Sequence, residues 1–232
     1  MKIFLAILFV VLVFFAARLG ELYTQLARYQ KYWTANNLRS VSPTDFVYVA
    51  LGDSAAQGVG ASKPQKGYVG LIAHELQEKK KADVKVINLS KSGAKVADVI
   101  KLQLPLYQEF KLKSQRHIVT IEIGANDIIT FNEEQFEREM DELISRLPRN
   151  AVLSDIPSFT GSRYARYEPR VLKANQIIHN LAGKHKIKLA ELHKRVADNH
   201  GLRTFAADLF HPSDYGYKTN WLPAFMERIN ER

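Results

Sequence analysis

The sequence predicts an α/β fold in which a mostly parallel five-stranded sheet lies between two layers of helices. Five short apolar segments rich in β-branched and aromatic residues alternate with segments of helical periodicity. Glycine, serine and asparagine follow three successive strand segments, and in parallel sheets such loops collect at one edge, beyond the carboxyl ends of the strands. This alternation indicates a three-layer α/β/α sandwich. A chain of 232 residues suffices for one such domain and an appendage.

The predicted elements follow one another from residue 46 to residue 229. The strand segments are FVYVAL (46–51), VKVINL (84–89), HIVTIEIG (117–124), AVLSD (151–155) and IKLAEL (187–192). The helical segments are 68–80, 96–104, 133–147, 166–185 and 214–229. Asn132 is expected to cap the third of these helices. Pro105 is expected to end the second, because proline lacks the N–H that a helix interior needs, whereas the last helix is expected to continue past Pro223.

Near the N-terminus, residues 3–17 form an uninterrupted apolar run. At about 1.5 Å per residue the run is shorter than the roughly 30 Å hydrocarbon core of a bilayer. It reaches across if the Arg18 side chain extends to the interface and Leu19 joins the span. A cleavable signal peptide is the alternative, because such peptides have apolar regions of about 7–15 residues. Phenylalanines occupy the positions where cleavage needs small residues, so we expect an uncleaved anchor.

The predicted organisation has three parts. Residues 1–35 form the anchor or signal helix, residues 36–45 a linker with turn-forming residues and a proline, and residues 46–232 the α/β domain. Positive charges flank the apolar run on both sides, so loop charge does not choose an orientation. We expect the α/β domain to lie outside the cytoplasm, anchored to the membrane by the single N-terminal helix, or to be secreted if the segment is cleaved.

Composition excludes several classes of function. The chain carries 33 Lys and Arg against 24 Asp and Glu, a net charge of +9, but the basic residues are scattered and no nucleic-acid-binding motif is present. We therefore expect no nucleic-acid partner. The absence of cysteine excludes disulfides, thiolate metal sites and a cysteine nucleophile. The histidines show no metal-binding spacing, so no metal is expected.

The loops after the strands carry a set of residues suited to acyl transfer. Ser54 follows the first strand, and Asp208 and His211 lie together in DLFHP (208–212). A serine hydroxyl needs a base to remove its proton, and that base needs an acidic partner to hold its tautomer. Each residue alone is typical of an ordinary turn or surface position, but their arrangement after the strands predicts a catalytic triad. The pair Asp198 and His200 is a weaker competitor, because no strand end frames it.

An acyl-transfer site also needs hydrogen-bond donors where negative charge develops on the substrate oxygen. The candidates are the backbone N–H groups of Ser54 and Gly93 and the side-chain amide of Asn126. Gly93 has no Cβ to obstruct a close backbone approach. Asp53 and Asp127 are expected to hold loop backbone by hydrogen bonds and to have no chemical role.

Four sequence blocks, in order, resemble the SGNH (GDSL-type) hydrolases. They are GDS at 52–54, the glycine at 93, GAND at 124–127 and DLFHP at 208–212. The first block departs from the family pattern, since an alanine follows GDS where leucine is common. The nucleophile elbow of α/β-hydrolases, G-x-S-x-G, is not matched, because alanine stands at its second glycine.

The resemblance implies roles for five residues. Ser54 would be the nucleophile, His211 the base and Asp208 its partner, and the oxyanion hole would comprise Ser54, Gly93 and Asn126. It also implies a flavodoxin-like α/β/α sandwich with a parallel five-stranded sheet and no cofactor.

The predicted function is a membrane-anchored serine ester hydrolase, a lipase, esterase or acylhydrolase that cleaves acyl or acetyl esters through an acyl-enzyme. Its partners would be the membrane and a small-molecule, lipid or glycan ester. One alternative is an O-acetyl esterase acting on envelope polysaccharide, and another is a catalytically inactive binding or scaffold module. The irregular segment 156–170, rich in tyrosine and arginine, is a candidate border of the acyl pocket.

Overall fold

The computed structural model describes residues 2–40, 46–111, 117–201 and 203–231. Its five strands form one parallel sheet in the order β2-β1-β3-β4-β5. The strands are β1 (Phe46–Gly52), β2 (Val84–Asn88), β3 (His117–Glu122), β4 (Val152–Ser154) and β5 (Lys188–Ala190). This order is that of flavodoxin-like doubly wound sheets, and the predicted fold class is confirmed.

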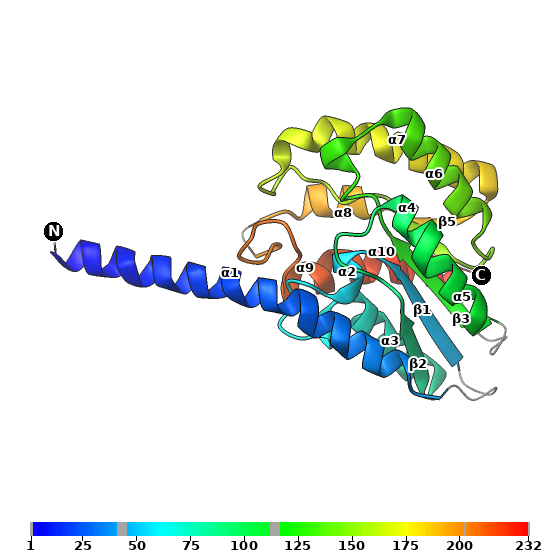
Figure 1. The fold of residues 1–232 in the computed structure, drawn as a ribbon, viewed down its shortest axis with the longest axis horizontal. Coiled ribbons are helices and arrows are strands. Elements are labelled where there is room, and N and C mark those ends of the chain that lie inside the picture. Colours follow the sequence, from blue (N-terminus) through cyan, green and yellow to red (C-terminus); the bar gives the residue numbers. More distant parts are fainter. Residues whose placement is uncertain (1, 41–45, 112–116, 202, 232) are drawn as a thin grey trace.

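Helices cover both faces of the sheet (Figure 1). The α-helices are α1 (Lys2–Asn37), α2 (Ser54–Gln57), α3 (Tyr68–Lys80), α4 (Val96–Asp98), α5 (Leu104–Lys111), α6 (Glu133–Ser145), α7 (Glu168–His185), α8 (Leu192–Asp198), α9 (Asp214–Gly216) and α10 (Leu222–Asn230). Asn132 caps α6 as predicted, because its side chain accepts a hydrogen bond from the Gln135 N–H at 2.9 Å. The short helix α8 was not among the predicted elements.

Strand β1 shows how the core divides between the two faces. Val47, Val49 and Leu51 belong to a cluster completed by α4–α7, whereas Tyr48 and Ala50 belong to a second cluster completed by α2, α3, α8 and α10. Successive strand residues point to opposite faces. Because helices cover both faces, the strand is apolar throughout rather than alternating.

Helix continuity differs from the prediction at Pro105. The helix does not end there but continues through α5 to Lys111, after a π-helical turn, η2 (Val99–Gln103). Pro223 follows a second such turn, η5 (Tyr217–Trp221). In an α-helix the proline ring meets the carbonyl four residues earlier, and the wider π turn accommodates it. Both prolines are therefore the second residue of a new α-helical segment.

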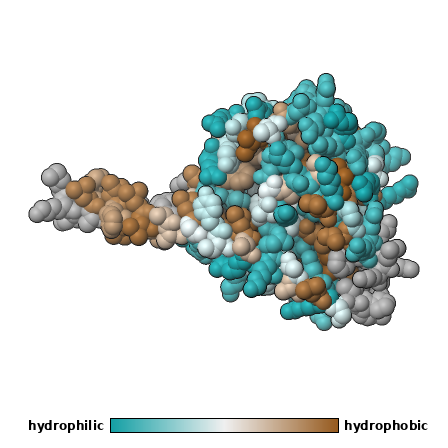
Figure 2. Space-filling model, in the orientation of Figure 1, coloured by the Kyte–Doolittle hydropathy of each residue, from teal (hydrophilic) through white to brown (hydrophobic). Residues whose placement is uncertain are grey.

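Helix α1 is the only helix of the described residues that is long and apolar enough to cross a membrane. Its most apolar 18-residue window has a mean hydropathy of 1.9, and only 6% of that window is buried. The apolar half projects from the domain (Figures 1 and 2). This exposure is inconsistent with a buried core helix, and both a membrane anchor and a signal sequence are compatible with it.

The other half of α1 packs against the domain, beside the edge strand β2. The Asn36 side chain donates to the Val86 carbonyl at 2.9 Å, and Asn37 exchanges two hydrogen bonds with the backbone of Asn88. These bonds use backbone groups that an edge strand would otherwise leave unpaired. The helix therefore extends two residues into the segment predicted as a linker, and residues 41–45 of that segment lie outside the described residues.

Candidate active site

Ser54 lies where β1 ends and α2 begins. The Asp53 carboxylate caps α2 by accepting the Ala55 N–H at 3.0 Å. The end of the strand is held by the Gln103 side chain, whose amide donates to the Gly52 carbonyl and accepts the Gly52 N–H, both at 2.8 Å. These bonds orient the turn that presents the Ser54 side chain at the carboxyl edge of the sheet.

The segment containing Asp208 and His211 is a tight turn built around the Asp208 carboxylate. One carboxylate oxygen accepts the backbone N–H groups of Phe210 and His211, each at 3.1 Å. Leu209 adopts a φ of +53°, and the turn is closed by the Ala206 N–H, which donates to the His211 carbonyl at 2.7 Å. The three-residue spacing therefore lets one carboxylate hold both the backbone and the ring of the histidine.

The structure brings Ser54, His211 and Asp208 into one hydrogen-bonded chain. The Nδ1–H of His211 donates to Asp208 Oδ2 at 2.6 Å, and the Ser54 hydroxyl donates to His211 Nε2 at 2.9 Å. Burial alone would raise the pKa of Asp208, but hydrogen bonds from the His211 ring and the turn backbone outweigh it and lower the pKa below its ordinary value. Asp208 therefore stays ionised near neutral pH, and Nε2 is free to accept the serine proton.

The three predicted oxyanion donors border the same cleft. A cleft of about 320 Å³ is lined by Ser54, Gly93, Asn126 and His211. Within the described part of the chain, neither the Ser54 N–H nor the Gly93 N–H donates to a protein acceptor. The prediction explained Gly93 by the need for a close backbone approach. A Cβ at Gly93 would meet no protein atom within 4 Å, but the φ of this residue is +78°. Backbone conformation, not crowding by the protein, requires this glycine.

The Asn126 amide is already hydrogen-bonded in this structure. Its nitrogen donates to Asp53 Oδ2 and to the Ala94 carbonyl, each at 3.0 Å. To donate to a substrate oxyanion, the amide would have to give up one of these two hydrogen bonds. The Asp53 contact is a link between the first and third sequence blocks that was not predicted.

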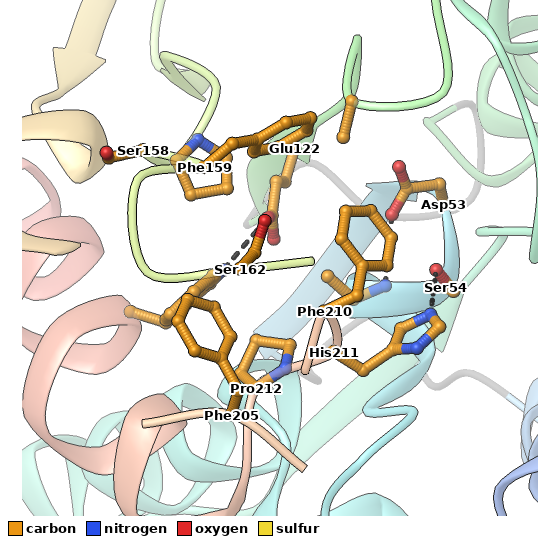
Figure 3. A pocket seen from close by; sticks show the side chains of 14 residues that line it. Asp53, Ser54, Glu122, Ser158, Phe159, Ser162, Phe205, Phe210, His211 and Pro212 are labelled. Carbon is orange, nitrogen blue, oxygen red and sulfur yellow. Dashed lines mark hydrogen bonds between the residues drawn. The ribbon is translucent and has the colours of Figure 1, made fainter. Parts of the chain in front are cut away.

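A smaller hollow of about 30 Å³ also adjoins Ser54 (Figure 3). Its apolar lining includes Phe159, Phe205, Phe210, Pro212 and Trp221. One water-sized group needs about 10–15 Å³ of such volume, so the hollow accommodates about two such groups. The segment 156–170 lines this hollow and also the larger cleft.

A model of the GDSL-like lipase/acylhydrolase family matches residues 50–219, more than half of the chain. The chain belongs to the GDSL-like lipase/acylhydrolase family. The predicted resemblance is thereby confirmed.

This GDSL-family protein also has a match among curated proteins. It is 30% identical over 133 residues to the spore germination lipase LipC of Bacillus licheniformis. That match covers 54% of this chain and 61% of the relative, so the chain spans about three fifths of the length of this curated relative.

Solved structures show the same fold at lower identity. The acetylxylan esterase Axe2 of Geobacillus stearothermophilus is 18% identical, with a TM-score of 0.61 over 84% of this chain and 98% of that one. A lipase/acylhydrolase from Enterococcus faecalis is 21% identical, with a TM-score of 0.63 over 79% and 95% of the two chains.

Glu122 is a residue of this GDSL-family site that sequence reasoning missed. It ends β3, is 5% exposed and lines the small hollow. One carboxyl oxygen accepts the Trp221 indole N–H at 2.8 Å, and the other has no partner among the described residues. Burial, with the nearby Asp53 carboxylate, raises the pKa of Glu122 well above its ordinary range. Burial therefore favours the neutral, protonated form of this side chain.

Away from Ser54, His211 and Asp208, the competing pair does not assemble. The His200 ring donates to the Ala197 carbonyl at 2.6 Å, and Asp198 pairs with Lys194. Among the described residues, no group of three or more histidine, aspartate or glutamate side chains is placed to hold a metal ion.

Two further buried acids support the site without lying in the triad. Burial raises the pKa of Asp53 to about 6 and that of Asp127 to about 7. Asp127 accepts the Val96 N–H at 3.3 Å, and this bond and the Lys95 ammonium only partly oppose the shift. Both aspartates hold loop backbone, in keeping with their predicted structural role.

Replacing Asp127 with asparagine is expected to flatten the pH dependence of stability. Since its pKa is raised from 3.8 to about 7, the folded state binds this proton more tightly than the unfolded chain, and stability is lost as the pH rises through that range. Melting temperatures at pH 5 and pH 8 in detergent measure the effect. The wild type should lose more stability between them than the variant, with the exposed Asp198→Asn as a charge control. Equal losses of stability in wild type and Asp127→Asn would contradict a raised pKa for Asp127.

Proposed function

We propose that this chain is a membrane-anchored serine esterase that removes short acyl groups, acetyl in particular, through an acyl-enzyme. The observation that carries the proposal is the unbroken hydrogen-bonded chain from Ser54 through His211 to Asp208. Family membership and the small hollow beside Ser54 also support it.

The proposed reaction begins when Ser54 Oγ attacks the ester carbonyl carbon and its proton moves to His211 Nε2. Asp208 stabilises the imidazolium that forms. The carbonyl oxygen becomes an oxyanion that accepts the backbone N–H groups of Ser54 and Gly93, and Asn126 adds a third donor by releasing the Ala94 carbonyl.

Collapse of the tetrahedral intermediate breaks the bond to the alcohol oxygen, which takes the proton from His211. A water molecule then attacks the acyl-enzyme, gives its proton to His211, and the acid leaves as Ser54 regains its hydrogen. The overall change is ester plus water to carboxylic acid plus alcohol, and no step requires a cofactor.

The small hollow beside Ser54 supports the proposed preference for short acyl groups. Its lining combines aromatic and proline side chains with polar ones such as Glu122 and Ser158, and its volume of about 30 Å³ suits a short acyl end such as that of an acetyl group. An O-acetyl esterase is therefore the candidate within this class that the geometry favours. The exposed apolar half of α1 supports attachment to a membrane. The proposed location of the domain is the outer side of that membrane, and a secreted form is the alternative.

The full chain in detergent micelles provides the test. A fluorophosphonate probe should label wild-type protein, and mass spectrometry should find the label on Ser54. Labelling and p-nitrophenyl acetate hydrolysis should disappear in Ser54→Ala and persist in Ser145→Ala, whose serine lies on the exposed face of α6. Acetate should be cleaved faster than octanoate. Labelling that survives in Ser54→Ala would refute the nucleophile, and absence of any ester hydrolysis would favour a binding module.

A further inference from the structure

Helix α1 forms one wall of a hollow that leads to the candidate catalytic histidine. The hollow has a volume of about 100 Å³, and its lining includes Leu19, Leu22, Tyr23 and Leu26 on α1 with Asp208 and His211 opposite. Leu26 and His211 also line the 320 Å³ cleft that contains Ser54. The two spaces therefore meet along the side of α1.

Buried hydrogen bonds hold this part of α1 against the domain. The Gln25 side chain donates to the Ala61 carbonyl at 3.2 Å and accepts the Gly60 N–H at 2.9 Å. The Tyr29 hydroxyl donates to the same carbonyl at 2.7 Å, and the Trp33 indole donates to the Gln57 carbonyl at 3.0 Å. The projecting apolar half of the helix is thus joined to the domain without a flexible connection.

The hollow along α1 offers a path for the leaving group of the proposed reaction. The leaving oxygen takes its proton from His211, so the alcohol portion of the substrate must extend past that residue. His211 lines this hollow, the larger cleft and the small hollow. Of these three spaces only this hollow is also lined by Asp208, whereas Gly93 and Asn126, two of the proposed oxyanion donors, line the larger cleft.

The outer end of the hollow lies next to the apolar run of α1. Leu19 is two residues beyond residue 17, about 3 Å along the helix, and Leu26 is about 10 Å further. A bilayer has interfacial layers of roughly 5–7 Å on each side of its hydrocarbon core. Leu19 would therefore lie where the hydrocarbon core meets the headgroup layer, with the exposed Tyr23 beside the rim. The loop that contains His211 lies on the same side of the domain as the projecting helix (Figure 1).

We propose that α1 lines a channel for the alcohol portion of the substrate, and that this alcohol is a membrane amphiphile whose apolar tail remains in or near the bilayer. The inference rests on the proposed function. Apolar side chains of α1 cover the tail as the ester rises from the interface to Ser54, which offsets the cost of exposing hydrocarbon to water. A free polysaccharide acetate has no tail to use this wall.

The test holds the acyl group constant and varies the alcohol. The full chain is reconstituted in phosphatidylcholine vesicles, and acetate release is measured from hexadecyl acetate in the vesicles and from ethyl acetate in solution. We expect turnover of hexadecyl acetate to exceed that of ethyl acetate by at least tenfold. Leu26→Trp, which fills the junction of the two spaces, should lower this ratio at least tenfold.

Ala27→Trp is the matched control, because Ala27 is exposed on α1 and does not line the hollow. It should leave the ratio within twofold of the wild-type value. No preference for hexadecyl acetate, or an equal fall of the ratio in both variants, would overturn the channel while leaving the esterase intact. Failure to hydrolyse either ester would overturn the proposed function itself.

Discussion

Replacing Asp208 with asparagine is expected to lower kcat for ester hydrolysis by about 10⁴-fold without unfolding the protein. The asparagine carbonyl oxygen can still accept the backbone N–H groups of Phe210 and His211, as Asp208 Oδ1 does. Its NH₂ group then faces the ring where Oδ2 stood, and two donors cannot share a hydrogen bond. His211 must therefore carry its hydrogen on Nε2, which points at Ser54 and can no longer accept the serine proton.

The measurement pairs kinetics with stability. Hydrolysis of p-nitrophenyl acetate gives kcat, and the melting temperature reports whether the turn survives. The control is Asp198→Asn, which makes the same charge change on an exposed side chain of α8. Activity of Asp208→Asn within tenfold of wild type would mean that Asp208 does not set the tautomer of His211.

Much of this site could be predicted because its chemistry is encoded locally. The segments before residues 54, 93 and 126 read as strands or strand ends, and parallel topology then brings the following loops to one edge. The Asp208 and His211 pair is three residues apart, so a single turn builds it. These relations need only the order of the elements and no knowledge of distant contacts.

Glu122 could not be found in the same way. In TIEIG its position alternates with apolar residues, which is typical of a strand with one face in water. Both faces of this sheet are covered, so the carboxyl group is buried, and its partner Trp221 lies 99 residues away. Only the packing of α10 and η5 against the sheet shows that this acid borders the small hollow.

The inward face of α1 presents the same difficulty. Helical periodicity predicts that the helix continues past residue 17, but nothing local distinguishes a face in water from one packed on the domain. Its hydrogen-bond acceptors, Ala61 and Gln57, lie 24 to 36 residues away along the chain. The channel can therefore be recognised only in the tertiary structure. The same holds for the π-helical turn η2, after which the helix continues past Pro105 as α5.

Replacing Gly60 with alanine is expected to lower kcat at least tenfold and to destabilise the fold by about 3 kcal/mol. A Cβ at this position would lie 2.3 Å from the Pro212 carbonyl oxygen and 2.9 Å from the His211 Cβ, and the φ of +93° disfavours any residue except glycine. The backbone of the His211 turn must move to relieve the contact, which lengthens the 2.9 Å hydrogen bond from Ser54 to His211. A displacement of about 1 Å in the proposed base is expected to cost up to about 10²-fold in rate.

Gly183→Ala separates this effect from that of glycine replacement in general. Gly183 lies within α7, and a Cβ there would meet no atom within 4 Å, so alanine should stabilise the helix by roughly 0.5–1 kcal/mol. Melting temperatures should therefore fall by about 10 °C for Gly60→Ala and rise slightly for Gly183→Ala. Fluorophosphonate labelling at a temperature where both variants are folded then isolates the geometry of the site. Labelling of Gly60→Ala at the wild-type rate would show that the His211 turn tolerates the shift, and that Gly60 serves stability alone.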